Sequence, residues 1–321
     1  MPILEGYKSE GRYIDMLGCH RAALRYLGAD VSYPWIYGAT GIAFAVNINA
    51  AVDCSGPTNW DWQQTFPLCR NLGYTVDGIM IRQIEAGDDF PRLQREAWDL
   101  LRESIDEGIP VYGWEVVPWI PCHGIITGYE GDDYLYSACG QQGRSSWTTL
   151  GNCDVKVVEV RRIMRCEPAP LLKTVYDSLN FALRMAEEPS DIVNPGYRTG
   201  SAAFALWADS LEAGTAERES QSFNAKCWLE CRTEAVSFLN EAKVALPGMA
   251  DSAFDATSHY YSAVCAALTA HLVLFPPSDG AADWNARLQS HESAILLREA
   301  AEAEACAISA LHDIVTSISV L

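Results

Sequence analysis

The chain has 321 residues, of which 49% are hydrophobic and 20% charged, and its formal net charge is −19. This length favours about two domains, and the composition allows sizeable cores and excludes a disordered chain. The acidic balance excludes a nucleic-acid-binding protein, which needs a basic face, and no stretch reaches the ~18 apolar residues that a membrane span requires.

The negative charge is explained most simply by solubility, and a sharper alternative is a cleft that attracts a polycation such as a polyamine or an aminosugar. Residues 1–15 are polar and carry both signs of charge, so we do not expect a signal peptide. The 11 cysteines are an odd number without a tight framework, which predicts free thiols in a reducing, cytoplasmic setting.

Strand and helical patterns are mixed before the Pro-bearing segment 166–170, and nearly all residues after it have helical periodicity. This change predicts two domains, 1–165 and 166–321. The first domain contains both helical and strand patterns, with a hairpin turn at Gly131-Asp132-Asp133. Its helical patterns cover residues 19–27, 61–71 and 91–107, and its strand patterns cover 74–84, 111–117, 123–129, 134–138 and 155–163. Helices followed by an antiparallel sheet predict an α+β fold.

The second domain has helical periodicity almost throughout, with Pro- and Gly-bearing breaks between the segments. The predicted helices cover residues 171–186, 199–213, 224–245, 250–274 and 282–317. We therefore expect a helical bundle.

Cys19 lies at the start of the first predicted helix, and His123 opens an apolar strand about a hundred residues later. A helix N-terminus lowers the pKa of a thiol, and an imidazole on a facing strand can take its proton. Cys19 and His123 are therefore our candidate catalytic pair, in the order found in papain-like enzymes. His20 points about 100° away from Cys19 on the same helix, which makes it a poor base.

The group that would orient the imidazole is harder to find. The strand after the histidine strand contains no Asp or Asn, which leaves Cys139 and Gln141 as candidates. The backbone N–H of Cys19 and the phenol of Tyr13 are candidate donors to an oxyanion.

Three further residues are candidates for the substrate cleft: Trp114, Glu115 and Trp147. Glu115 could bind an amine, and Trp147 could shield the catalytic pair from water. The chain has no phosphate-binding glycine loop, no dinucleotide fingerprint and no HExxH motif, so we expect neither a cofactor nor a metal.

The chain resembles the butirosin-biosynthesis acyltransferase family, whose N-terminal domain is papain-like and is similar to the double-glycine cysteine peptidases. The resemblance rests on residues 18–28 (GCHRAALRYLG), 32–35, 38–44 (GATGIAF), 107–111 (EGIPV), His123 and 128–129, and on 196–200 (GYRTG) and the Trp207 helix of the second part.

The resemblance implies a cysteine acyltransferase that moves an acyl or aminoacyl group from a carrier-protein thioester to an amine. Cys19 matches its nucleophile and His123 its base. Where the family pattern has an aspartate on the next strand, this chain has Ala138-Cys139-Gly140.

We therefore expect a papain-like α+β domain followed by an α-helical domain. The expected activity is cysteine-dependent acyl transfer to an amine acceptor, as in natural-product biosynthesis. A cysteine peptidase or amidohydrolase and a catalytically silent papain-like binding protein are the alternatives. The expected partners are a small-molecule amine or peptide substrate and an acyl carrier protein.

Overall fold

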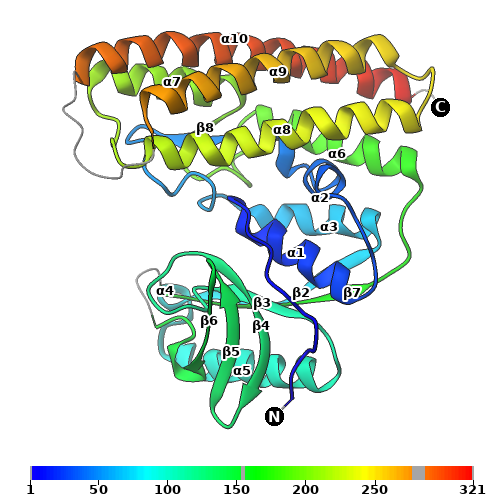
Figure 1. Ribbon diagram of the computed structural model, residues 1–321, viewed down its shortest axis with the longest axis vertical. Coiled ribbons are helices and arrows are strands. Elements are labelled where there is room, and N and C mark those ends of the chain that lie inside the picture. Colours follow the sequence, from blue (N-terminus) through cyan, green and yellow to red (C-terminus); the bar gives the residue numbers. More distant parts are fainter. Residues whose placement is uncertain (1, 153–155, 277–285, 320–321) are drawn as a thin grey trace. The chain divides into compact units, whose positions relative to one another are not determined.

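The computed structural model describes residues 2–152, 156–276 and 286–319. The chain divides into two compact units (Figure 1). The first contains residues 1–36 and 73–168, and the second contains 37–72 and 169–321. A mixed unit with a sheet and a helical unit make the α+β composition that the sequence predicted.

The first unit is built on a six-stranded antiparallel sheet in the order β2-β7-β3-β4-β5-β6. The strands are β2 (Tyr74–Arg82), β3 (Val111–Trp114), β4 (His123–Glu130), β5 (Asp133–Ala138), β6 (Gln141–Ser146) and β7 (Val157–Arg165). Strand β6 was not predicted, because its polar residues 141–146 lack the alternation of a half-buried strand. Val155, the predicted start of β7, lies outside the described residues.

Two helices pack against this sheet: α1 (Asp15–Tyr26) against β4 and β7, and α5 (Phe90–Asp106) against β2, β7, β3 and β4. The buried face of α5 carries Ala97, Trp98, Leu101 and Ile105, at the spacing of one helical stripe. A short helix, α4 (Gln83–Ala86), follows β2.

In the described part of the C-terminal half, the second unit contains five helices. They are α6 (Leu171–Ala186), α7 (Gly200–Ala213), α8 (Gln221–Ala245), α9 (Asp251–Leu274) and α10 (Ala286–Ser319). Helix α10 packs along α9 and α7, and α8 packs along α9 (Figure 1). The predicted bundle is therefore present, although residues 282–285 of its last predicted helix lie outside the described residues.

The predicted boundary near residue 166 lies close to residue 168, where the chain passes from the first unit to the second for the last time. Residues 37–72, however, belong to the helical unit and not to the first. This segment contains the end of α2 (Tyr33–Ala39), β1 (Asn47–Asn49) and α3 (Phe66–Cys69). Strand β1 pairs with β8 (Tyr197–Thr199). The side chains of residues 37–72 complete the helical core; Phe44, for example, packs on Phe238 and Tyr261.

One buried ion pair holds these parts of the helical unit together. Arg232 of α8 donates two hydrogen bonds to the carboxylate of Glu304 on α10, at 2.9 and 2.7 Å. Its remaining nitrogen donates to the backbone oxygens of Ala43 and Ala45. Both side chains are buried, so each depends on the other to offset the loss of hydration.

Candidate active site

Helix α1 carries two of the site residues one turn apart, Asp15 and Cys19. The helix begins at Asp15, so the prediction that Cys19 stands at its N-terminus was wrong by four residues. Asp15 is suited to a first helical turn because its carboxylate interacts favourably with the helix dipole. Cys19 is the fifth helical residue, and its N–H is therefore used within the helix and is not free to hold an oxyanion.

His123 is the first residue of β4, and Asp15 holds it by two hydrogen bonds. The Nδ1 atom of its ring lies 2.7 Å from Oδ1 of Asp15, and its backbone N–H donates to Oδ2 at 2.9 Å. An ionised carboxylate can only accept, so Nδ1 carries a proton. The group behind the imidazole thus comes from the start of the helix and not from the strand after His123.

A second carboxylate lies on the other side of the ring. Oε2 of Glu159, on β7, is 3.5 Å from Nε2 of His123, and its other oxygen accepts a hydrogen bond from Nε of Arg161 at 3.1 Å. Glu159 and Arg161 are 2% and 5% exposed. Charged residues are rarely buried so deeply unless they are paired, as these are.

The carboxylates determine the charge of the imidazole. Burial alone would lower the pKa of His123, but Asp15 and Glu159 raise it to about 9. Burial would raise the pKa of Glu159, but His123 and Arg161 lower it. At neutral pH the site therefore holds an imidazolium and a guanidinium against two carboxylates.

Cys19 belongs to the same cluster, and its thiol is buried at 3% exposure. Burial raises its pKa well above the usual value, and the charges of Asp15 and Glu159 raise it further. The sequence predicted a lowered pKa for this thiol, and that prediction was wrong. The N-terminus of the helix lies at Asp15, one turn before Cys19, so it does not offset the burial of the thiol and the two negative charges. We call Asp15, Cys19, His123, Glu159 and Arg161 the His123 cluster.

His20 has a structural role. Its Nδ1 and Nε2 atoms lie 3.1 and 3.0 Å from the hydroxyls of Tyr74 and Tyr112, and the ring is fully buried. Burial, with smaller contributions from His123 and Arg161, lowers the pKa of His20 to about 3. A neutral imidazole between two phenols ties α1 to the sheet.

None of the residues predicted to orient the imidazole or hold an oxyanion is the group that Nδ1 of His123 contacts, which is Asp15. Cys139 forms a disulfide with Cys122, so these two cysteines are not free thiols as composition suggested. Gln141 begins β6 and is exposed, and Tyr13, which precedes α1, is 46% exposed. Asp15 replaces all of them as the group hydrogen-bonded to the ring of His123.

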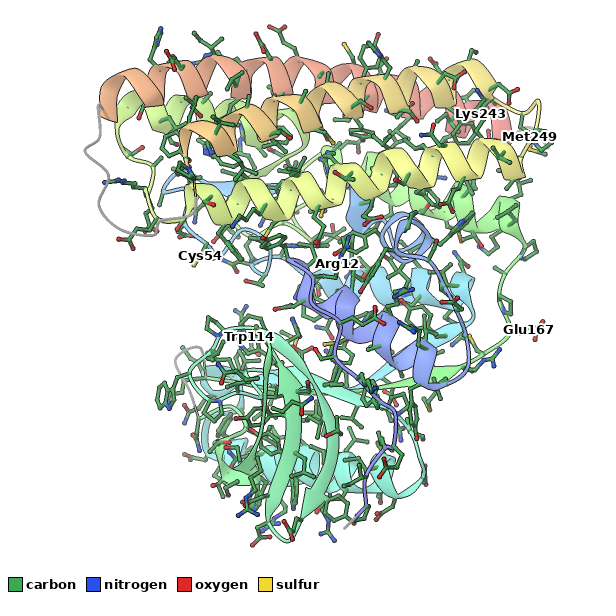
Figure 2. All side chains as sticks on the ribbon, viewed as in Figure 1. Arg12, Cys54, Trp114, Glu167, Lys243 and Met249 are labelled. Carbon is green, nitrogen blue, oxygen red and sulfur yellow. A yellow bond between two sulfur atoms is a disulfide. The ribbon has the colours of Figure 1, made fainter. Side chains whose placement is uncertain are left out.

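Of the three candidate cleft residues, Trp114 lies beside the histidine. It pairs with His123 across β3 and β4, and the two rings meet edge to face at 4.8 Å between centroids. Figure 2 shows Trp114 at the end of its strand. Glu115 is buried, with a left-handed φ of 48°. Trp147 stacks under the guanidinium of Arg95 at 3.9 Å.

Asp15, Glu159 and Arg161 were not predicted from the sequence. A signal for the last two was present, because β7 reads Val-Val-Glu-Val-Arg-Arg-Ile, and charged residues alternate there with β-branched ones in a strand that has neighbours on both sides. Asp15 lies four residues before Cys19, on the same helical face. A predicted helix that began at residue 15 would have placed Asp15 beside Cys19.

Among the described residues, no group of three or more His, Cys, Asp or Glu side chains is arranged to hold a metal ion. Likewise, none of the helices in the described part of the chain is long and apolar enough to cross a membrane. No protein-family model matches the sequence, and no curated protein matches it either.

Proposed function

We propose that the first unit is a papain-like domain and that the protein is a cysteine-dependent acyltransferase, with Cys19 as the nucleophile, His123 as the base and Asp15 as the orienting group. The observation that carries the proposal is the two-point contact of Asp15 with His123, one helical turn from the Cys19 thiol. A nucleophile, a base and a third group that orients the base are the parts that covalent catalysis requires.

The proposed reaction has two stages. The base is the fraction of His123 that has lost its Nε2 proton, which grows as the pH approaches about 9. This neutral ring takes the thiol proton of Cys19 at Nε2 while Asp15 accepts from the Nδ1–H, and the thiolate attacks the carbonyl of a thioester. The carrier thiolate leaves and takes that proton. An amine then attacks the acyl-cysteine, its nitrogen loses a proton through His123, and the amide is released as the Cys19 thiol re-forms.

The charges of the His123 cluster support an amine as the acceptor. Two carboxylates face one imidazole and one guanidinium, so a thiolate at Cys19 would leave the cluster with an excess negative charge. A substrate that arrives as an ammonium ion would offset that charge and favour the thiolate. Release of the acyl group to water instead would make the protein a peptidase or an amidohydrolase.

A catalytically silent binding protein is the second candidate, and one specific observation favours it. Cys19 is buried, and its pKa is raised by burial and by both carboxylates. A thiol in this state is a poor nucleophile at neutral pH.

The test is the alkylation rate of Cys19 by iodoacetamide between pH 6 and 10, followed by peptide mass spectrometry. If Cys19 and His123 exchange a proton, His123→Gln changes the pH dependence of this rate, and Asp15→Asn changes it in the same direction. Cys54, an exposed free cysteine of the other unit, serves as the internal reference. Equal profiles in the wild type and both variants would exclude the catalytic pair.

A second measurement separates the activities. The protein is mixed with S-acetyl-N-acetylcysteamine as the acyl donor, with and without putrescine as the amine. Acyl transfer predicts a Cys19-dependent acetyl adduct and N-acetylputrescine, and hydrolysis predicts acetate only. A Cys19→Ser variant that forms the same products at the same rate would refute the role of Cys19.

A further inference from the structure

The disulfide between Cys122 and Cys139 lies directly beside the histidine. Cys122 is the last residue of the loop between β3 and β4, so His123 follows it in the chain. Cys139 begins the turn between β5 and β6. The β4–β5 register, in which Ile125 pairs with Ser137, leads toward His123 and Cys139 as opposite residues. The bond therefore joins two loops at the His123 end of the sheet.

The two cysteine residues differ in their exposure to solvent. Cys122 is 7% exposed, whereas Cys139 is exposed at the tip of a turn in which it and Gly140 have left-handed φ values of 50° and 74°. Two successive residues with positive φ are typical of a tight hairpin turn. We therefore expect a small thiol to attack at Cys139, the more exposed residue, with Cys122 as the leaving group.

The peptide group between Cys122 and His123 is held on both sides. Its carbonyl oxygen, from Cys122, accepts a hydrogen bond from the N–H of Glu115 at 2.9 Å. Its N–H, from His123, donates to Asp15 at 2.9 Å. The disulfide adds a third constraint on the same residue, through the side chain of Cys122. Any movement of Cys122 is thus transmitted to the hydrogen bond between His123 and Asp15.

The rest of the loop offers Cys122 less support than a strand would. Within residues 115–122, Glu115 and Trp119 have left-handed φ values of 48° and 69°, and the Trp119 side chain is 63% exposed. Non-glycine residues adopt such angles only where their surroundings hold them. Opening the disulfide removes the covalent part of that support.

We propose that Cys122 and Cys139 form a thiol–disulfide exchange site that controls how firmly His123 is held against Asp15. In reduction, the thiolate of a low-molecular-weight thiol attacks the sulfur of Cys139, the S–S bond breaks, and Cys122 leaves as a thiolate that takes up a proton. The thiolate of a second small thiol then attacks the small-molecule sulfur of the mixed disulfide, the bond to Cys139 breaks, and Cys139 leaves as a thiolate that takes up a proton. Two small thiols are thus oxidised to one disulfide, and two protein thiols form. The consequence for acyl transfer rests on the proposed function, but the structural coupling does not.

The test is amide hydrogen exchange of the full chain, measured by NMR in the disulfide state and after reduction with glutathione. Differential alkylation and mass spectrometry establish the state of both cysteines. We expect exchange of the His123 amide to accelerate on reduction by about tenfold or more, because its acceptor is Asp15 across the affected loop. Ile125 and Ile126, inside the β3–β4 ladder, should change by less than about twofold. An unchanged His123 amide, or a pair that stays reduced in oxidised glutathione, would overturn the proposal.

Two variants make the experiment specific. Cys139→Ser cannot form the bond, so its His123 amide should exchange like that of the reduced wild type and should not respond to glutathione. The matched control is Cys54→Ser with Cys306→Ser, which removes two exposed free cysteines and should keep the full response. Figure 2 labels Cys54.

The failures of the two proposals are distinguishable. Cys19→Ser abolishes acyl transfer but leaves the redox response of the His123 amide intact. A redox response without any acyl adduct would refute the proposed function alone. If an acyl adduct forms on Cys19 but the exchange rate of the His123 amide is the same before and after reduction, only the exchange site is refuted.

Discussion

Replacing Asp15 by asparagine tests the electrostatics of the His123 cluster directly. The substitution keeps the size of the side chain and an oxygen that can accept a hydrogen bond, but it removes the negative charge 2.7 Å from the imidazole. The folded protein raises the pKa of His123 from 6.5 to about 9, which corresponds to a preference for the imidazolium on the order of 3 kcal/mol. Asp15 contributes more of this preference than Glu159 does.

We therefore expect Asp15→Asn to lower the pKa of His123 by more than about one unit and to remove on the order of 2 kcal/mol of stability at pH 6.5. The sign follows from linkage. A folded-state pKa above the unfolded one stabilises the fold fully below pH 6.5, and this stabilisation is lost as the pH rises through about 9. The difference between variant and wild type should consequently shrink toward pH 10.

The assay is an NMR titration of the histidine rings from pH 5 to 10, with unfolding measured by urea at pH 6.5 and 10. The chain has six histidines, and burial lowers the pKa of both His20 and His271 to about 3, so neither should titrate in this range. His123→Gln assigns the resonance. A His123 ring that titrates near pH 6.5 in the wild type, or near pH 9 in Asp15→Asn, would refute the reasoning.

Other perturbations have equally definite outcomes. Arg232→Met leaves the buried Glu304 carboxylate without its partner and should lower the free energy of unfolding in urea by about 3–5 kcal/mol. Adding Glu304→Leu to the same chain should recover most of this loss, and a double variant no more stable than the single one would contradict the reasoning. Gly38→Ala would place a Cβ atom 2.0 Å from Cγ of the buried Phe238 ring, so unfolding should become easier by about 1–3 kcal/mol, and an unchanged urea midpoint would show that the helical core adapts freely. Without substrate, the alkylation rate of Cys19 should still be rising at pH 9, because burial and two carboxylates raise its pKa, and a plateau reached by pH 7 would argue against those charges.

Much of the local structure could be predicted from the sequence. The stripe of α5, the strand-like patterns of β2, β4 and β5, and the Pro and Gly breaks between the C-terminal helices are local signals, and they led to elements that the structure contains. Helix α6 has the predicted bounds, Leu171–Ala186. These signals are reliable because each depends on residues within one or two turns or pleats of one another.

The assignment of residues 37–72 to the helical unit could not be predicted in this way. The segment forms only short elements, and its place depends on partners about 150 residues or more away, such as the pairing of Asn47 with Thr199 and the packing of Phe44 on Phe238. Contacts at such separations leave no periodicity in the segment itself.

The same distinction applies to the candidate site. By itself, the sequence made Cys19 and His123 candidates, because a thiol on a helix and an imidazole opening a strand are local patterns. Only the tertiary structure brought Asp15 to one side of the imidazole and Glu159 to the other, 108 residues and 36 residues away along the chain, and so decided the charge of the site. Charge–charge interactions depend on distance in space and on burial, and the order of residues along a chain specifies neither until the sheet has formed.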